Sequence, residues 1–357
     1  MNHPPRSDFG ASAQEGPFIL RDRRTPAQRR SRLRGDRLTP FTLRLRAVVG
    51  VLACVAAAVA VARDDDPQLR AEAIAPGAYV VAGRMAAWGP DGHGQVANSG
   101  FIVGARCVAV IDGGGSAAVG RGLLAAIRQV SALPVCYVIN THAHPDHVLG
   151  NAAFAEAGST PPRFVAHRKF AAALAARAPY WLKVIRHETP RSEPDPALPA
   201  PTLVVDHTLE LDLGERVLEL RAWPTAHTDN DLTVWDGGSA TLWLGDLAFI
   251  GHLPVLDGRL RGWRDTLQAL RSLQPAQAVP GHGPVIRDWP AGLGPTANYL
   301  AELERDVRAA LREGLTLAQT VERLGARPDA RLTGWELTEV FHRRNVTAAY
   351  AELEWSE

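Results

Sequence analysis

The sequence predicts an α/β protein whose two halves, each a sheet covered by helices, pack sheet against sheet. Two observations lead to this fold class. Strand-like and helix-like segments alternate along most of the chain, and they do so in two successive rounds with the same layout. The chain has 357 residues, of which 46% are hydrophobic and 22% charged, which is enough for one large domain with a substantial core.

The first 62 residues differ from the rest and are interpreted as a disordered basic leader (1–62) that contains a signal peptide. Residues 21–46 are rich in arginine, residues 47–62 are apolar, and Ala60 and Ala62 fit the small-x-small rule for cleavage. The apolar run is shorter than the roughly 18 to 20 residues of a membrane-spanning helix. We therefore expect cleavage after Ala62 and a periplasmic or secreted protein that contacts the membrane only through its leader. An uncleaved leader anchored in the inner membrane is the alternative.

The first round of elements opens the main domain, which we place at residues 63–300. The helical spacing of Leu123, Ile127 and Val130 predicts a helix, and the Pro-rich residues 189–201 predict a loop. The predicted strands are residues 77–89, 95–104, 107–114, 134–142 and 163–167, and the predicted helices are residues 120–131, 144–158 and 169–187.

The second round contains the remaining strands of this domain. Alternating hydrophobic residues and a turn at Gly214 predict a hairpin meander over residues 202–224. The later predicted elements are two strands within residues 231–246, a helix at 263–273, and a strand and loop at 277–286. Residues 301–357 are predicted to be helices that pack on the same domain.

Charge and cysteine content argue against two classes of protein. Lys and Arg number 39 against 38 Asp and Glu, a formal net charge of +1, so no overall basic field favours nucleic acid. Outside the leader only Cys107 and Cys136 remain, too few for a disulfide-built scaffold. Each stands five residues before the end of a strand-like run, so the two could pair. Two separate buried thiols are the favoured interpretation.

The segment THAHPDH, residues 141–147, concentrates three histidines and an aspartate just after a predicted strand. The carboxyl ends of strands are where α/β proteins assemble their sites. This spacing lets His142 and His144 contact one metal ion while Asp146 and His147 face a second. Zinc accepts both imidazole and carboxylate ligands, and a catalytic zinc site keeps a position open for water. An exposed polar loop is the alternative interpretation.

Three later segments supply the remaining candidate ligands, each after a strand-like run. They are His227 in AHTDND, Asp246 in GDLAF and His282 in PGHGP. Singly, each residue type is unremarkable at such a position, but together with the first segment they complete a set for two metal ions. The predicted set places His142, His144 and His227 on one ion, Asp146, His147 and His282 on the other, and Asp246 as the bridge.

Four further residues are candidates for the surroundings of the metals. Asp112, after VAVI, is expected to hold a ligand histidine by its second nitrogen, with capping of the Gly-rich turn as a nearly equal alternative. Trp88 and His93 stand at a predicted hairpin tip that could fold over the site. His252 follows Asp246 by six residues and is expected to line the substrate pocket.

These motifs resemble those of the metallo-β-lactamase superfamily, in which THxHxDH, GH, GD and PGHG recur. The resemblance covers nearly all of the chain after the leader. It implies an αβ/βα four-layer sandwich of two mixed sheets with outer helices and a metal site at one edge. Residues 223–236, 252–263 and 341–355 are most similar to the quinoprotein relay system zinc metallohydrolases. That subgroup implies export and an association with dehydrogenases that depend on pyrroloquinoline quinone.

The predicted function is that of an exported dinuclear zinc-dependent hydrolase. Two metal ions about 3.5 to 4 Å apart lower the pKa of a shared water, and the metal-bound hydroxide then attacks the substrate. Asp146 is expected to orient this nucleophile. An ester- or thioester-like small molecule is favoured, since Asp246 stands where one lactamase branch has a cysteine ligand. Iron or manganese would also suit these ligands.

Two alternatives to this function stay open. The protein could be a periplasmic metal-binding or relay partner of a quinoprotein dehydrogenase that turns over no small molecule. It could also be a β-lactamase. The seven candidate ligands favour an enzyme over an inert metal binder, because structural zinc sites are usually closed and four-coordinate.

Overall fold

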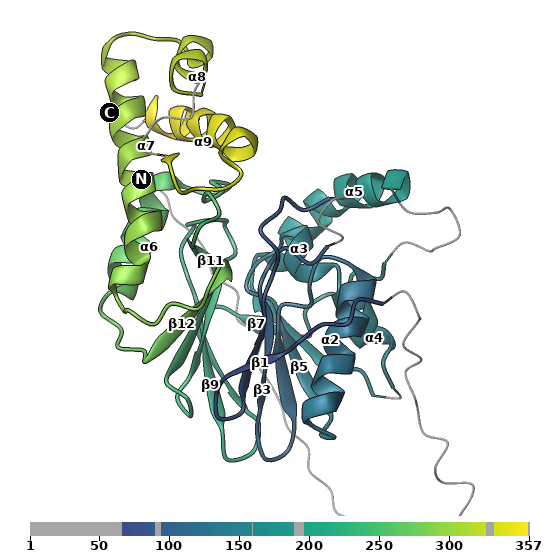
Figure 1. The fold of residues 1–357 in the computed structure, drawn as a ribbon. Coiled ribbons are helices and arrows are strands. Elements are labelled where there is room, and N and C mark those ends of the chain that lie inside the picture. Colours follow the sequence, from purple (N-terminus) through teal and green to yellow (C-terminus); the bar gives the residue numbers. More distant parts are fainter. Residues whose placement is uncertain (1–65, 90–93, 159, 189–195, 326–331, 356–357) are drawn as a thin grey trace, which may run out of the picture. The chain divides into compact units, whose positions relative to one another are not determined.

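The computed structural model describes residues 66–89, 94–158, 160–188, 196–325 and 332–355 (Figure 1). The leader predicted at residues 1–62, its cleavage site after Ala62, and His93 lie outside the described residues. No helix within the described ranges is long and apolar enough to cross a membrane. The elements described below belong to one compact unit.

The first of two β-sheets has seven strands in the order β1-β2-β3-β4-β5-β6-β7. Strands β1 to β4 pair antiparallel, and β4 to β7 pair parallel, so the sheet is mixed. The bounds are β1 Glu72–Ala75, β2 Ala78–Val81, β3 Ser99–Val103, β4 Val108–Ile111, β5 Val135–Ile139, β6 Arg163–His167 and β7 Leu203–Val205.

The second sheet has five strands in the order β12-β11-β10-β9-β8. Strands β8 to β11 form an antiparallel meander, and β12 joins β11 in parallel. The bounds are β8 Thr208–Asp212, β9 Val217–Ala222, β10 Leu232–Asp236, β11 Thr241–Phe249 and β12 Gln277–His282.

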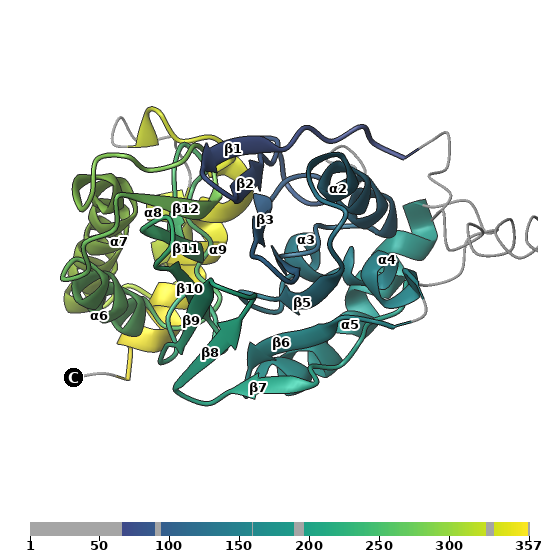
Figure 2. The same ribbon diagram turned by 90° about the horizontal axis from the view of Figure 1, so that it is seen from below.

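Helices cover the outer face of each sheet, as Figures 1 and 2 show. Those beside the first sheet are α2 Ala117–Val130, α3 Pro145–Val148, α4 Asn151–Glu156 and α5 Phe170–Glu188. Beside the second sheet lie α6 Leu260–Leu270, the short η2 Ala291–Leu293 and α7 Gly294–Arg312. Helices α8 Leu317–Gly325 and α9 Thr338–Leu353 pack against α7 beyond the upper edge of this sheet. The order helix, sheet, sheet, helix confirms the predicted four-layer α/β sandwich of two mixed sheets.

Three hydrophobic clusters hold these layers together. One lies between the sheets and contains Ile111, Leu220 and Val234. A second joins α2 to the first sheet, and a third joins α6, α7 and α9 to the second. Trp263 in α6 is fully buried, and its Nε1 donates to the Leu247 carbonyl at 3.0 Å. Strands β4 and β11 are buried along their whole length, as expected for strands covered on both faces.

Two segments differ from their predicted structure for steric or topological reasons. Residues 144–158 form two short helices instead of one, and Gly150 between them packs so closely on Gly113 that a Cβ atom would lie 1.9 Å from its carbonyl oxygen. Residues 202–224 do not form one meander. Strand β7 pairs with β6 in the first sheet, and only β8 and β9 belong to the second.

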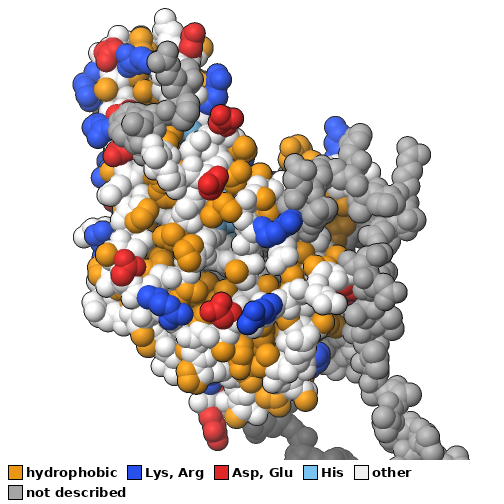
Figure 3. Space-filling model, viewed as in Figure 1, with side chains coloured by type: hydrophobic (Ala, Val, Ile, Leu, Met, Phe, Trp, Pro, Cys, Tyr) orange, Lys and Arg blue, Asp and Glu red, His pale blue; other side chains and the backbone are white. Residues whose placement is uncertain are grey.

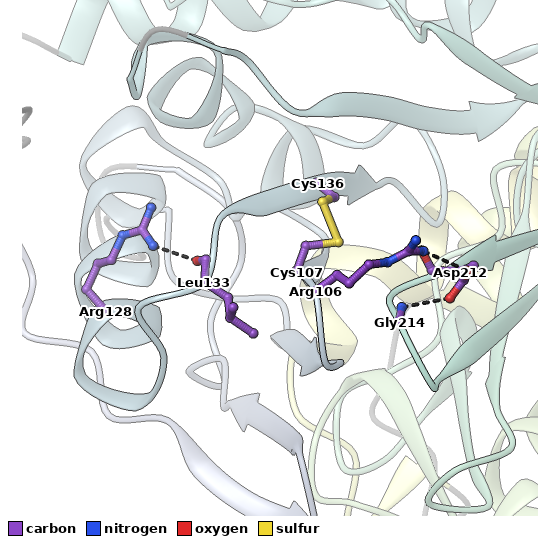
Figure 4. Close-up of a disulfide and its surroundings, with 7 residues drawn as sticks. All are labelled: Arg106, Cys107, Arg128, Leu133, Cys136, Asp212 and Gly214. Atoms are coloured by element: carbon purple, nitrogen blue, oxygen red, sulfur yellow. Dashed lines mark hydrogen bonds and ion pairs between the residues drawn. A yellow bond between two sulfur atoms is a disulfide. The ribbon is translucent and has the colours of Figure 1, made fainter.

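The expectation of two separate thiols is wrong, because Cys107 and Cys136 form a disulfide (Figure 4). Val108 faces Val135 across the β4–β5 pair, whereas Ala109 faces Tyr137. Cys136 is therefore an extra residue on β5, and it reaches Cys107, which directly precedes β4. The two Cα atoms lie 5.8 Å apart, within the usual range for a disulfide. Register of this kind depends on the neighbouring strand, so local sequence spacing did not reveal it.

The turn next to this disulfide also joins the two sheets. The backbone N–H of Arg106 donates to the Leu213 carbonyl at 2.8 Å, and its guanidinium pairs with Asp212 at 2.6 Å (Figure 4). Asp212 Oδ1 in turn accepts from the Gly214 N–H at 2.7 Å. These contacts connect the β3–β4 turn to the β8–β9 turn and restrain how the sheets align.

Removal of the disulfide is expected to lower the free energy of unfolding. The closed segment spans 29 residues, for which the loss of chain entropy in the unfolded state corresponds to about 3 to 4 kcal/mol. Urea unfolding of the protein lacking its leader, with and without reductant, measures this difference. The Cys107→Ala/Cys136→Ala protein is the control, since reductant should not change its midpoint. Equal midpoints for the unsubstituted protein with and without reductant would contradict the prediction.

Candidate metal centre

Side chains from four separate segments converge at one edge of the two sheets. The loop after β5 provides four of them, and the β9–β10 loop, β11 and the end of β12 provide one each. Their candidate ligand atoms fall into two groups, and within each group these atoms lie within 4.8 Å of one another. The first group is His142, His144, His227 and Asp246, and the second is Asp146, His147 and His282.

The four side chains that follow β5 divide between the two groups of candidate ligands. His144 lies in extended backbone directly before α3, whereas Asp146 and His147 lie in the first turn of α3, which Pro145 begins. The change from extended to helical backbone turns the second pair of side chains away from the first. A histidine pair and an aspartate–histidine pair therefore enter different groups, as the spacing predicts.

The first group gathers three imidazoles and one carboxylate oxygen. Asp246 Oδ2 lies 3.6 Å from His142 Nε2 and 3.3 Å from His227 Nε2. His144 Nδ1 lies 3.2 Å from His227 Nε2. All but His144 are almost completely buried, and 13% of the His144 side chain is exposed.

The second group shares the same carboxylate. Asp246 Oδ1 lies 3.2 Å from His147 Nε2 and 3.5 Å from His282 Nε2. Asp146 Oδ2 lies 3.3 Å from His282 Nε2 and 3.7 Å from His147 Nε2. Since its two oxygens face the two groups, Asp246 occupies the position of a bridging ligand.

Three buried polar atoms in this cluster have no hydrogen-bond partner among the described residues: His142 Nε2, His147 Nε2 and Asp246 Oδ1. Burying a polar atom without a partner costs about 1 to 3 kcal/mol. His147 Nε2 and Asp246 Oδ1 lie 3.2 Å apart without the alignment of a hydrogen bond. A cation contacting these atoms would satisfy them, so the residues fit a metal site. Imidazole and carboxylate donors suit zinc, iron and manganese.

The electrostatics of the cluster also favour a cation. Burial alone would raise the pKa of Asp246, but the charges of His282 and His147 outweigh it and lower this pKa well below its usual value. Burial alone would lower the pKa of His282, but Asp246 and Asp146 outweigh it and raise this pKa to about 9. Burial lowers the pKa of His227 to about 3. The carboxylates thus create a negative field that draws positive charge to the cluster.

Asp112 lies behind the cluster, in contact with a candidate ligand. Its Oδ2 accepts from His147 Nδ1 at 2.8 Å and from the Thr141 hydroxyl at 2.8 Å, and its Oδ1 accepts from the Thr141 N–H. The backbone of Asp112 has φ 56°, a left-handed conformation that is uncommon for residues other than glycine. This conformation lets one carboxylate hold both the His147 ring and the start of the metal loop.

The other imidazoles are oriented in the same way by their second nitrogen. His227 Nδ1 donates to the Val255 carbonyl at 2.7 Å, and His282 Nδ1 donates to the Val96 carbonyl at 3.0 Å. His144 is turned the other way round: its Nε2 lies 2.9 Å from Asp257 Oδ2, which leaves Nδ1 facing the cluster. These contacts fix each ring before any ion binds.

Two glycines make room for the bridging carboxylate. A Cβ atom on Gly281 would lie 1.8 Å from Asp246 Oδ1. Gly245 has φ 51° and packs on Thr141, whose Cβ would lie 2.6 Å from an added methyl carbon. The glycines of the GD and PGHG motifs therefore serve close packing around Asp246.

Of the residues predicted to line the substrate pocket, Trp88 is half-buried and His252 is buried. The Nε1 of Trp88 donates to the Gly115 carbonyl at 3.1 Å, and its side chain packs against the hydrophobic cluster that includes Ala143. His252 is 3% exposed, and its ring centroid lies 4.6 Å from that of His282. His252 thus packs behind a candidate ligand and exposes little surface to a pocket. His93 lies outside the described residues.

Sequence reasoning missed Asp257 and the polar residues of the β9–β10 loop. Asn230 Oδ1 accepts from the Ala143 N–H at 2.8 Å and so ties the two metal loops together. Asp231 accepts from the Thr228 N–H and hydroxyl, and burial raises its pKa to about 8. The polar run TDND after His227 was the available signal for Asn230 and Asp231. Asp257 lies in the β11–α6 loop, within residues 252–263 that carry part of the family resemblance, but sequence reasoning did not select it as a candidate.

Comparison with known proteins agrees with this architecture. A sequence model described as the metallo-beta-lactamase superfamily matches residues 94–282, slightly more than half of the chain. No curated protein sequence matches the chain.

Similar solved structures share the fold. The sec-alkylsulfatase Pisa1 from Pseudomonas sp. superposes with a TM-score of 0.60 at 16% identity, over 79% of this chain and 50% of that one. A beta-lactamase domain protein from Burkholderia ambifaria gives 0.59 at 17% identity, over 80% and 88%. A metallo-beta-lactamase from Pontibacter korlensis gives 0.53 at 20%, over 66% and 99%.

At these identities the likeness concerns the fold alone, and the chain spans about half the length of the sulfatase. The matched residues 94–282 nevertheless include all seven side chains of the metal cluster. The chain belongs to the metallo-beta-lactamase superfamily.

Proposed function

We propose that this chain is an exported hydrolase that holds two zinc ions and cleaves an ester- or thioester-like substrate with a metal-activated water. One observation carries the proposal: the two oxygens of Asp246 face two separate groups of candidate ligands. A shared carboxylate between two ligand groups is typical of hydrolytic two-metal sites, whereas structural zinc sites usually close around one ion.

The seven side chains of the cluster would hold the two zinc ions. His142, His144 and His227 would hold one ion, Asp146, His147 and His282 the other, and Asp246 both. When bound, the zinc ions would supply Lewis acidity and bring the pKa of a water close to 7.

Asp146 is the candidate catalytic residue of this set. Burial alone would raise its pKa, but His147 and His282 outweigh it and lower this pKa to about 2, so the carboxylate is charged at neutral pH. Its side chain is 12% exposed, more than those of His147, His282 and Asp246 in the same half of the cluster. A charged carboxylate at the exposed side of the cluster can accept a hydrogen bond from the attacking water and orient it toward the substrate.

Export and a setting beside a quinoprotein dehydrogenase belong to the same proposal. The disulfide between Cys107 and Cys136 supports an oxidising compartment such as the periplasm. The basic and apolar leader supports export. The resemblance of residues 341–355 to quinoprotein relay system metallohydrolases supports the dehydrogenase setting.

Metal content is the first expected outcome. The purified protein, lacking the leader and loaded with zinc, should hold close to two ions per chain, and His282→Ala should hold about one, because the second group loses one of its three ligands. Elemental analysis after gel filtration measures both. His207→Ala, whose side chain is 86% exposed, is the matched control and should keep two ions. A single ion in the unsubstituted protein would mean that the second group is misread.

Reaction class is the second expected outcome. Asp246 stands where one lactamase branch has a cysteine ligand, and its two oxygens face both groups of candidate ligands. We therefore expect kcat/KM for esters or thioesters to exceed that for lactams by at least roughly tenfold, a transition-state difference of about 1.4 kcal/mol. Steady-state kinetics on matched substrate panels decide this. Efficient lactam turnover would favour a β-lactamase, and a two-metal protein without any turnover would favour a relay partner.

The same assay tests the role of Asp146. Asp146→Asn should lower kcat by about a hundredfold or more while changing KM less, because it weakens the orientation of the nucleophile. Glu313→Gln, in an exposed pair with Arg323, is the control. A loss confined to KM would assign Asp146 to substrate binding.

Processing of the leader is the third expected outcome. Protein recovered from the periplasm of a Gram-negative host should begin at Arg63, because Ala60 and Ala62 form the cleavage motif. N-terminal sequencing or intact mass identifies this end. An Ala62→Arg protein should stay uncleaved. If the unsubstituted protein were instead found at full length in the inner membrane of the host, residues 47–62 would be a membrane anchor.

A further inference from the structure

Two arginines from different helices meet beside the metal cluster. Arg177 lies on α5, which packs beside the first sheet, and Arg344 lies on α9, which packs against α7. In Figure 1 these helices stand on either side of the sheet edge that carries the cluster, and Figure 3 shows the surface hollowed between them. Through Asp257 the two arginines lie next to His144, one of the seven side chains of the cluster.

Both guanidinium groups contact the carboxylate that orients His144. Arg177 Nη1 lies 2.5 Å from Asp257 Oδ2, and Arg344 Nη2 lies 3.2 Å from Asp257 Oδ1. The same Oδ2 is 2.9 Å from His144 Nε2. The arginines are thus one side chain away from a candidate metal ligand.

The charges at this point do not balance. Within the described ranges, Asp257 is the one carboxylate that forms an ion pair with either arginine, so two positive charges face one negative charge. The side chain of Asp257 is 12% exposed, whereas those of Arg177 and Arg344 are 40% and 53% exposed. A guanidinium has five N–H donors, so each arginine retains donors that reach solvent.

The arginines are also held in place by their helices. Asn345, next to Arg344, donates to the Pro254 carbonyl at 2.6 Å and accepts from the Leu256 N–H at 2.9 Å, which fixes α9 on the loop that bears Asp257. Ala178, next to Arg177, is buried in the hydrophobic cluster that packs α5 on the first sheet. Binding an anion here would therefore need little reorganisation of the backbone.

We infer that Arg177 and Arg344 form an anion-binding subsite, and that the substrate carries a carboxylate group at a distance from its scissile bond. Guanidinium groups bind carboxylates through paired, charge-assisted hydrogen bonds, which give both affinity and orientation. The inference rests on the proposed ester or thioester hydrolysis, and it adds the class of substrate: a monoester or monothioester of a dicarboxylic acid.

The test compares two esters of equal chain length on the zinc-loaded protein. The p-nitrophenyl monoester of adipic acid carries a terminal carboxylate, whereas p-nitrophenyl hexanoate is neutral. We expect kcat/KM to be higher for the adipate ester. Arg177→Gln and Arg344→Gln should each lower kcat/KM for the adipate ester about tenfold more than for the hexanoate ester, mainly through KM.

Control variants separate charge recognition from structural damage. Arg344→Lys keeps the charge and should retain part of the preference for the adipate ester. Arg323→Gln, in an exposed pair with Glu313 near the C-terminal helices, should leave both esters unaffected. Equal losses on both esters in Arg177→Gln and Arg344→Gln would overturn the inference, because the arginines would then only position Asp257 and His144.

If neither ester is hydrolysed, the proposed function fails, but the subsite can still be tested by a binding measurement. Calorimetry with adipate on the zinc-loaded protein should show binding that weakens about tenfold in Arg177→Gln and Arg344→Gln, and that weakens with added salt. Binding that is unchanged in both variants, or no binding to the unsubstituted protein, would overturn the subsite.

Discussion

The buried carboxylate of Asp246 is the constraint on which the rest of the structure depends. An ionised carboxylate far from water is costly unless charged or polar partners surround it. Here imidazole nitrogens of His142, His147, His227 and His282, which come from both sheets, lie 3.2 to 3.6 Å from its oxygens. The fold must therefore bring loops that are distant in sequence to the same edge, and close packing at Gly281 leaves the carboxylate just enough space.

Meeting this constraint requires the two sheets to be aligned at both ends. At the cluster, the Leu232 N–H donates to the Thr141 carbonyl at 2.7 Å, and Asn230 accepts from Ala143, so the two metal loops are joined directly. At the opposite end, the β3–β4 turn is hydrogen-bonded to the β8–β9 turn. The hydrophobic layer between the sheets fills the space between these two attachments. A rigid sandwich of this kind can hold ligand atoms at defined separations, which hydrolysis by two metal ions demands.

Carboxylates in the next layer connect the cluster to the remainder of the molecule. Asp112 links His147 to the strand β4, and Asp257 links His144 to α5 and α9 through two arginines. The C-terminal helices are thereby part of the surroundings of the site and not only a cover for the second sheet. Because a candidate metal ligand and two exposed cationic groups share one carboxylate, an anion bound by the arginines would act on the orientation of His144 through Asp257.

The sequence by itself determined the fold class, most strands and helices, and the seven residues that converge. Alternating and helical hydrophobic spacing is a local property, and histidines and aspartates after apolar strands indicate a metal site without any knowledge of their partners. Only the tertiary structure decided the Cys107–Cys136 disulfide, the place of β7 in the first sheet, and the contacts of Asp257. Each of these depends on register or on the meeting of elements far apart in the chain, which local spacing does not encode.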